Sequence, residues 1–472
     1  MMKNSTSPAA RAKRTKYLSA LVPQCLLLIA LSTSAAEPAG KWPPPYQNDP
    51  AVAKQLEALA DNTAATLPVK VEGLEGGWEK SDWLKTGPFT RGFSCKMAYA
   101  PDRRTAFYCG QDHNLPHFND AWEFHLGSAT WHCLSNPDGG DTGAYWRNMT
   151  VKVLGRGGKG MEPDEKKREE LRAKLKEYME KTVHLKDGYL QTKKNGGPVF
   201  AWHTWDGLSY DPGTGRMYWA VLDDDGVMKS YLKTFCTVTG ADFAALEKEL
   251  KPGMGLWSFD PGTKKWARWS GTGPHPRMRG MGGALTYIPD LKKTVWYVAA
   301  YNVSPADCQM WIYDAATDKW EDLKPKCDWG KKESPVAEQQ MAYSPKHKKL
   351  VAVVEKNTFV YDFATNAWSK VATEEDQYAS DCRTVFAYDS TSDVFLLYNA
   401  PKGQWDKSRD LRAFDLKTGK WEKLVPQGAP VPGDCRKGYY DPEHNCLVIA
   451  GQGPVWVYRY KKVGQTGGAK QL

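Results

Sequence analysis

The segment WIYDAATDKW, residues 311–320, contains the pattern from which the fold of this chain can be predicted. Tyr313 lies seven residues before Trp320, and the short polar residues Asp314 and Thr317 lie between them. Short polar side chains of this kind bond to the backbone in turns, and the residues on either side alternate between apolar and polar. The segment therefore predicts a β-hairpin, with Trp320 on its second strand.

The same pattern recurs elsewhere, which indicates a repeat protein. The further copies are WEFHLGSATW at 122–131, WSFDPGTKKW at 257–266, FVYDFATNAW at 359–368 and AFDLKTGKW at 413–421. A second element precedes the hairpins and consists of a tyrosine, a turn and an apolar strand. It occurs six times, at Tyr99, Tyr210, Tyr287, Tyr343, Tyr388 and Tyr440. Together the two elements predict six units of four strands each.

Six four-stranded units of this length resemble the kelch-repeat β-propeller family. The resemblance is to its bacterial, secreted branch, within the galactose-oxidase-like central-domain superfamily, and it covers residues 71–462. It implies an all-β, six-bladed kelch-type β-propeller with two helical insertions, and a seven-bladed propeller is the alternative.

The spacing of the tryptophans predicts how the ring closes. The sixth unit contains Trp456 and Tyr458 but has no tryptophan seven residues after Tyr458. Trp78 lies 21 residues before Tyr99, which matches the interval from Trp266 to Tyr287. We therefore expect an N-terminal strand around Trp78 to complete the last blade and to join both ends of the chain.

The N-terminus has the features of a secretory signal. Residues 1–17 carry five basic residues and no acidic one, an apolar core follows at 25–31, and small residues occupy 34–36. Cleavage after about Ala36 is predicted, so we expect the mature chain in the periplasm or outside the cell. Without these five basic residues, 59 basic residues face 55 acidic ones. This balance does not suggest a nucleic-acid partner, and no later segment is apolar enough to span a bilayer.

Several regions lie outside the repeats. Residues 37–70 predict a proline-rich lead-in with a short helix at 51–60, and residues 463–472 predict a flexible tail. Insertions interrupt the repeats at about 138–197 and 224–254, with helices expected at 162–181 and 242–250. These helices are expected either to lie on the propeller disc or to dock a partner.

Polar residues just before the repeated tyrosines form the candidate ligand site. In a propeller the first strand of each blade lines the central channel, and ligands are generally held at its mouth by several blades. The candidates are Arg91, His203, Asp206, Arg279, Glu338, Asp381, Arg383, Asp434 and Arg436. They predict a polar pocket for an anionic or sugar-like ligand, or else charges that satisfy one another around a narrow, water-filled channel.

The cysteines suggest disulfides rather than a metal site. Cys308 and Cys327 flank one hairpin and fall almost opposite each other, so they are candidates for a disulfide. Cys95 and Cys109 flank another hairpin and are a second candidate pair. No Cys-x-x-Cys or zinc-like spacing occurs, so neither a structural metal nor a cofactor is predicted.

Two functions are compatible with these observations. The first is a secreted or periplasmic module that binds an unknown protein or carbohydrate without catalysis, favoured by the repeats and by the lack of a recognisable catalytic set. The alternative is a small-molecule enzyme, such as a sugar-acid epimerase or mutarotase, which the resemblance to six-bladed bacterial kelch proteins that epimerise sialic acids implies. Its base would be Glu338, His203 or an aspartate, with arginines such as Arg279 as carboxylate clamps.

The shape of the channel separates the two functions. A deep pocket with convergent arginines and one acid would favour the enzyme. A plugged channel with an apolar patch on one face would favour the binding module.

Overall fold

The computed structural model describes most of the chain as one compact unit within residues 39–472. The described residues are 45–89, 91, 94–110, 119–137, 146–155, 159–199, 204–220, 225–251, 255–269, 271, 273–276, 283–298, 309–327, 340–378, 384–401, 408–433 and 437–462. The predicted signal segment and the predicted C-terminal tail lie outside them. No helix in this part of the chain is both long and apolar enough to cross a bilayer.

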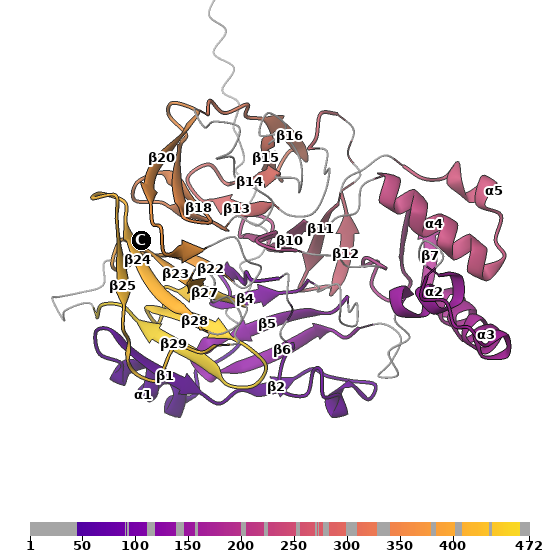
Figure 1. The fold of residues 1–472 in the computed structure, drawn as a ribbon, viewed down its shortest axis with the longest axis horizontal. Coiled ribbons are helices and arrows are strands. Elements are labelled where there is room, and N and C mark those ends of the chain that lie inside the picture. The colour runs from indigo at the N-terminus through magenta and orange to yellow at the C-terminus, as the bar shows by residue number, and fades with distance from the viewer. Residues whose placement is uncertain are drawn as a thin grey trace, which may run out of the picture. The chain divides into compact units, whose positions relative to one another are not determined.

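Six sheets form the blades of a β-propeller, so the predicted six-bladed fold is confirmed and the seven-bladed alternative is wrong (Figure 1). The strands of each blade are given from the channel outward. Blade 1 consists of β3 (Ala98–Ala100), β4 (Thr105–Tyr108), β5 (Ala121–His125) and β6 (Thr130–Ser135), and β2 (Lys70–Glu72) pairs with the outer edge of β6. Blade 2 consists of β9 (Leu208–Asp211), β10 (Arg216–Ala220), β11 (Leu256–Asp260) and β12 (Lys265–Arg268), and blade 3 of β13 (Ala284–Ile288), β14 (Lys293–Val298), β15 (Gln309–Asp314) and β16 (Lys319–Asp322).

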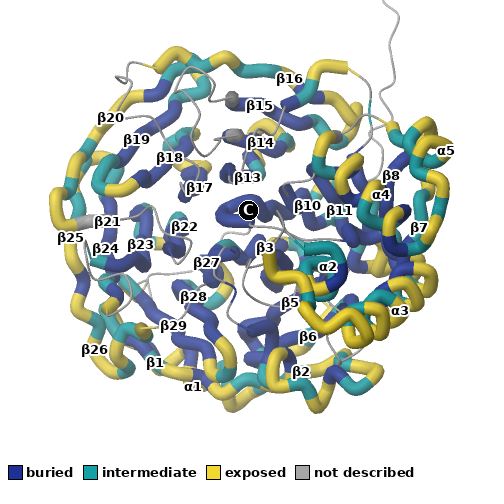
Figure 2. The backbone as a smooth tube through the Cα atoms, turned by 45° about the vertical axis from the view of Figure 1, so that its right-hand side comes forward, coloured by how far each residue is buried: buried dark blue, intermediate teal, exposed yellow. Residues whose placement is uncertain are grey.

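The other three blades complete the ring. Blade 4 consists of β17 (Gln340–Ser344), β18 (Lys349–Val354), β19 (Asn357–Asp362) and β20 (Ala367–Thr373). Blade 5 consists of β22 (Val385–Asp389), β23 (Val394–Pro401), β24 (Asp410–Asp415) and β25 (Lys420–Leu424), and β21 (Gln377–Tyr378) pairs with β23. Blade 6 contains β27 (Lys437–Asp441), β28 (Cys446–Ala450) and β29 (Val455–Arg459). The six innermost strands contact one another in succession around a closed ring. Figure 2 shows these inner strands buried and the rim exposed.

The repeated aromatic–tryptophan motif forms the hairpin between the third and fourth strands of a blade. Tyr313 and Trp320 lie directly opposite each other in β15 and β16, with ring centroids 4.8 Å apart. The turn between them begins with Asp314, whose carboxylate accepts from the Ala316 backbone N–H at 3.0 Å. Asp318 follows in the left-handed conformation, with φ of 55°. The other four copies pair their aromatic residue and tryptophan in the same register.

An N-terminal strand closes the ring, as predicted, but Trp78 is not in it. Strand β1 (Thr63–Leu67) pairs antiparallel with β29 and completes the sixth blade, with the short β26 (Gln427–Gly428) at its other edge. Trp78 starts the short 3₁₀ helix η1 (Trp78–Lys80), and its indole donates to the Pro137 carbonyl at 3.2 Å. The preceding Gly77 has a φ of 96°, which turns the chain away from the extended conformation that a strand needs.

The helical insertions pack together beside blade 2. The first contains α2 (Trp146–Leu154), α3 (Glu165–Thr182) and a hairpin of β7 (Val183–Lys186) and β8 (Tyr189–Thr192); the second contains α4 (Asp225–Thr239) and α5 (Phe243–Glu247). Helix α4 contacts α3, α5 and β8 (Figure 1). The Asn195 carbonyl, just after β8, accepts from the Trp266 N–H of β12 at 2.8 Å. The helices therefore lie at the outer edge of one blade.

The described part of the lead-in begins at Pro45 and contains the predicted helix. Helix α1 (Pro50–Ala58) has proline at its first position, and the Asp49 side chain caps it by accepting from the Ala51 N–H at 2.9 Å. Helix α1 is followed by β1, so part of the region expected as a lead-in belongs to the propeller itself.

Candidate functional site: the tyrosine mouth of the channel

The innermost strands all run in the same direction along the channel. The bridges between them are parallel, and they join Ser94 to Trp205, Lys96 to Gly438 and Asp206 to Ala284. Every innermost strand therefore starts at one mouth of the channel and ends near the other, where its repeated tyrosine lies. We call the mouth where the strands start the polar mouth, after the polar residues that precede these strands in the sequence. We call the mouth where the strands end the tyrosine mouth, which is defined by Tyr99, Tyr210, Tyr287, Tyr343, Tyr388 and Tyr440.

An ion pair plugs the channel between the two mouths. The Asp206 carboxylate accepts from the Lys96 ammonium at 3.3 Å and from the Met341 backbone N–H at 3.0 Å. The same ammonium donates to the Leu285 carbonyl at 2.8 Å. These residues belong to blades 1, 2, 3 and 4, so the contacts cross the channel. Backbone hydrogen bonds at the same level join the inner strands directly, such as Met97 N–H to Gly438 C=O at 2.9 Å.

Burial of the plug changes the ionisation of Asp206. Its side chain is 2% exposed, against 18% for Lys96. Burial raises the pKa of Asp206 to about 6, although the positive charge of Lys96 opposes this shift. At neutral pH the ion pair therefore predominates, and mild acid neutralises its carboxylate.

A cavity of about 340 Å³ lies on the tyrosine side of the plug. Every blade contributes the same positions to it, because each inner strand ends in a tyrosine that a turn follows. The tyrosines form the rim together with Pro101, Pro212, Pro289, Pro345 and Pro442. Small residues precede five of the tyrosines and leave space inside; these are Ala98, Ser209, Thr286, Ala342 and Ala387.

Three rim tyrosines tie neighbouring blades together. Tyr210 of blade 2 donates its hydroxyl to Asp102, in the turn of blade 1, at 2.9 Å. Tyr343 of blade 4 donates to Asp290 in the turn of blade 3, and Tyr440 of blade 6 donates to Thr391 in the turn of blade 5 at 2.9 Å. These three are buried, whereas Tyr99, Tyr287 and Tyr388 are half-buried. The alternation holds the rim in position and leaves every second tyrosine more open to solvent.

The described lining of the cavity consists of tyrosine rings, apolar side chains and a few polar groups. Among the described residues that line the cavity there is no carboxylate, imidazole or guanidinium group. Burial raises the pKa of both Tyr287 and Tyr388 to about 12, so both are neutral at physiological pH. Lys96, the lysine among the described lining residues, is held by Asp206 in the plug.

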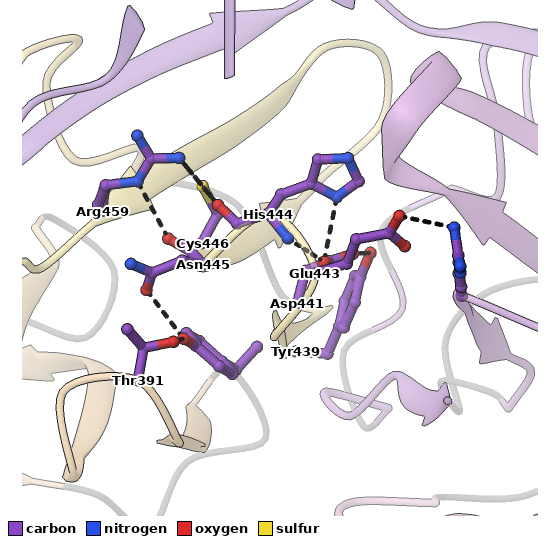
Figure 3. A network of polar contacts seen from close by, with 10 residues as sticks. Thr391, Tyr439, Asp441, Glu443, His444, Asn445, Cys446 and Arg459 are labelled. Atoms are coloured by element: carbon purple, nitrogen blue, oxygen red, sulfur yellow. Dashed lines mark hydrogen bonds and ion pairs between the residues drawn. The ribbon is translucent and has the colours of Figure 1, made fainter. Parts of the chain in front are cut away.

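A polar network that begins at the cavity wall supports the rim at blade 6 (Figure 3). Tyr439 stacks against Tyr99 with ring centroids 5.9 Å apart, and its hydroxyl donates to Asp441 at 3.2 Å. The other carboxylate oxygen of Asp441 contacts Nδ1 of His444 at 3.2 Å. Burial opposes the charged imidazole, but the hydrogen bond and charge of Asp441 raise the pKa of His444 above its usual value. Arg459 donates to the His444 carbonyl at 2.9 Å and fixes this turn against the closing strands.

Two of the predicted site residues are in the described part of the chain, and the structure places them apart. Arg91 is fully buried; it donates to Asp120 at 2.6 Å and to the Gly110 carbonyl at 2.7 Å. Its guanidinium also lies over the rings of Phe89 and Tyr108. Arg91 is therefore held within blade 1, whereas Asp206 lies in the plug.

The other predicted residues lie outside the described part of the chain. They are His203, Arg279, Glu338, Asp381, Arg383, Asp434 and Arg436. Lys96 and the hydroxyls of Ser209 and Thr286 were not among the predicted residues. The sixfold tyrosine repeat is visible in the sequence. Its recurrence at the end of every inner strand was the available signal for this mouth.

The structure contradicts one of the predicted disulfide pairs and speaks against the other. Cys95 and Cys109 are both buried thiols, so a disulfide between them is wrong. Cys95 instead donates to the Trp205 carbonyl at 3.3 Å. Cys327 is an exposed thiol without a disulfide, which speaks against its predicted pairing, and Cys308 lies outside the described residues. Among the described residues no group of three potential metal ligands gathers at one place.

Comparison with known proteins identifies a structural similarity but no family. No family model and no curated protein matches the chain. Among solved structures, it is similar to an auxiliary nutrient binding protein from Bacteroides thetaiotaomicron, with 9% sequence identity and a TM-score of 0.43 over 85% of this chain and 77% of that chain. At this level the similarity carries no argument about ligand or mechanism.

Proposed function

We propose that this protein is an exported, non-catalytic binding module whose ligand enters the tyrosine mouth. The observation that carries the proposal is the blind cavity of about 340 Å³ between the tyrosine rim and the Lys96–Asp206 plug. Small-molecule sites typically occupy roughly 300–1,000 Å³ and have mainly apolar linings with a few polar groups. The cavity meets this description at the lower end of the range.

The absence of acid–base groups supports binding without catalysis at this mouth. General acid–base catalysis needs a group whose pKa lies near the working pH and within reach of the substrate. None of the described lining residues supplies such a group, because the rim tyrosines stay neutral and Lys96 is paired. A plugged channel with an apolar pocket on one face is the arrangement expected of a binding module.

The ligand is a carbohydrate or an apolar group of a partner protein. Tyrosine rings bury large apolar faces and present hydroxyls at one end, which suits both kinds of ligand. Export rests on the sequence features of residues 1–36, and it places the ligand in the periplasm or outside the cell.

The test compares a variant of the tyrosine mouth with a variant of Arg279, an arginine that the sequence suggested as an anion clamp. Thermal unfolding of the purified protein would be recorded with neutral sugars, acidic sugars and small phenols, because a ligand that binds only the native state raises Tm. We expect the shift caused by a binding ligand to disappear in Tyr287→Ala and to persist in Arg279→Ala. Tyr287 is suitable because it is a half-buried rim residue outside the three tyrosines that tie the blades together.

The opposite pattern would move the site. A shift with an acidic sugar that disappears in Arg279→Ala and persists in Tyr287→Ala would contradict binding at the tyrosine mouth. It would favour the alternative of a sugar-acid enzyme, with Glu338 or His203 as the base expected from the sequence.

A further inference from the structure

The cavity behind the tyrosine rim has two chemically different sides. Inside the rim, blades 1 to 3 contribute the ammonium of Lys96 and the hydroxyls of Ser209 and Thr286, and Ser390 of blade 5 adds a hydroxyl in the turn after Tyr388. Blades 4 and 5 contribute Met341, Ala342, Phe386 and Ala387, and blade 6 adds the Tyr439 ring. A ligand that fills the cavity therefore meets hydroxyls along one edge and apolar surface along the other.

The polar side offers no unpaired charge to a ligand. A lysine ammonium has three N–H donors. Those of Lys96 are directed to Asp206 at 3.3 Å, the Leu285 carbonyl at 2.8 Å and Thr286 Oγ1 at 3.4 Å. Because Asp206 neutralises the lysine and all three donors have acceptors, an anionic group entering the cavity would find no cation available to pair with it.

The two hydroxyls have hydrogen-bonding capacity to spare. Thr286 Oγ1 accepts from Lys96, so its own proton is available for an acceptor. Ser209 is 3% exposed, and its hydroxyl has no hydrogen-bond partner in the structure. Buried polar groups are nearly always hydrogen-bonded in proteins, so the Ser209 hydroxyl points to a missing polar partner on the cavity side.

We infer that the cavity takes a neutral sugar ring, an assignment that rests on the proposed binding function. The hydroxyls of a sugar can pair with Ser209 and Thr286, and its flat C–H face can pack against Phe386 and Tyr439. An acidic sugar would bury a carboxylate without a free cation, and a purely apolar ligand would leave both hydroxyls unpaired. The plug closes the far end, so the ring is a monosaccharide or the terminal residue of a glycan.

The experiment uses matched probes on the purified full chain. Isothermal titration would compare glucose with glucuronic acid, galactose with galacturonic acid, and p-cresol as an apolar probe. We expect at least one neutral sugar to bind about tenfold or more tightly than its matching acid. Ser209→Ala and Thr286→Val should each weaken the binding of that sugar by about tenfold, since each removes one buried hydrogen bond, and should leave the binding of p-cresol unchanged.

A control variant and two contrary outcomes make the test decisive. Ser369→Ala changes an exposed serine on the outer strand of blade 4 and should bind as the wild type does. Tighter binding of the acidic sugar than of the neutral sugar, or binding of p-cresol alone, would overturn the neutral-sugar assignment. If Tyr287→Ala abolishes that binding, the proposed site itself still holds. If Tyr287→Ala changes the binding of none of the probes, the proposed function itself fails.

Discussion

The carboxylate of Asp206 accepts a hydrogen bond from the ammonium of Lys96 at 3.3 Å, although the two residues are 110 positions apart in the sequence. Lys96 precedes β3 in blade 1 and Asp206 precedes β9 in blade 2. With the Met341 N–H of blade 4 as a third participant, the pair spans the channel. This contact turns a through-channel into a blind cavity, and the proposed function depends on it.

Asp206→Asn should flatten the pH dependence of stability between pH 4 and 7. The pKa of Asp206 is raised to about 6 from its usual 3.8, so its protonated form stabilises the fold. This contribution is fully present below pH 3.8 and is lost as the pH rises through 6. It amounts to about 3 kcal/mol. Urea unfolding at pH 4 and pH 7 would measure the free energy of unfolding for both proteins.

An exposed carboxylate provides the control for this prediction. Asp49 is on the surface and pairs with Lys70, so Asp49→Asn should leave the pH dependence between 4 and 7 close to that of the wild type. An unchanged slope in Asp206→Asn would show that this carboxyl does not titrate in the range expected.

Arg91→Met should destabilise the protein strongly, because Arg91 pairs with Asp120 at 2.6 Å and both side chains are fully buried. Removing one member of a buried ion pair leaves an uncompensated charge and costs about 3–5 kcal/mol. Arg104→Met is the matched control, since Arg104 is exposed and its pair with Glu443 should contribute no more than about 1 kcal/mol. Similar losses in the two variants, measured by denaturant unfolding, would contradict the structural role of Arg91.

Ala65→Pro should open the ring, whereas Ala64→Pro should be milder. The carbonyl of Asn62 accepts from the Gln427 N–H of the short edge strand β26, and the carbonyl of Ala64 accepts from the Ala429 N–H just after it. The alternate residue Ala65, opposite Val457, therefore directs its backbone toward β29. Proline at 65 removes a hydrogen bond from the closing ladder and leaves a buried carbonyl unpaired, at a cost of about 1–3 kcal/mol. Equal unfolding free energies for the two variants would show that β1 does not close the ring in this register.

Asp441→Asn should lower the pKa of His444. Asp441 is buried and its carboxylate raises the pKa of His444 above the usual 6.5. The stability that this imidazole contributes is therefore fully present below pH 6.5 and is lost as the pH rises through the raised pKa. An NMR titration of the His444 ring in both proteins measures the shift directly. A pKa that is unchanged or higher in Asp441→Asn would contradict the pairing seen in Figure 3.

The blades could be predicted from the sequence because their determinants are local. Tyr313 and Trp320 lie on two strands of one hairpin, and the turn residues between them specify that hairpin without any distant contact. Helix α3 was predicted for the same reason. Helix α4 was missed, although Met228, Tyr231 and Leu232 are buried at helical spacing and were an available signal.

The sequence predicted that an N-terminal strand closes the ring, but it did not identify the residues of that strand. The missing fourth strand of the last blade implied that an N-terminal strand pairs with it, and the spacing of Trp78 suggested that this strand lies around residue 78. Any short extended segment with alternating burial can pair with β29, so the spacing of one tryptophan does not select among them. The backbone conformation at Gly77 excludes Trp78, and β1 takes its place.

The six repeats, their four-stranded form and the tyrosine at the end of every inner strand can be predicted from the sequence, because these features depend on residues close together in the chain. The position of the described cavity at one mouth of the channel follows from the folded structure instead. The plug needs Lys96, Asp206 and Met341, which belong to three different blades. No local pattern encodes how side chains from separate blades meet on the channel axis, since that depends on how the blades close into a ring.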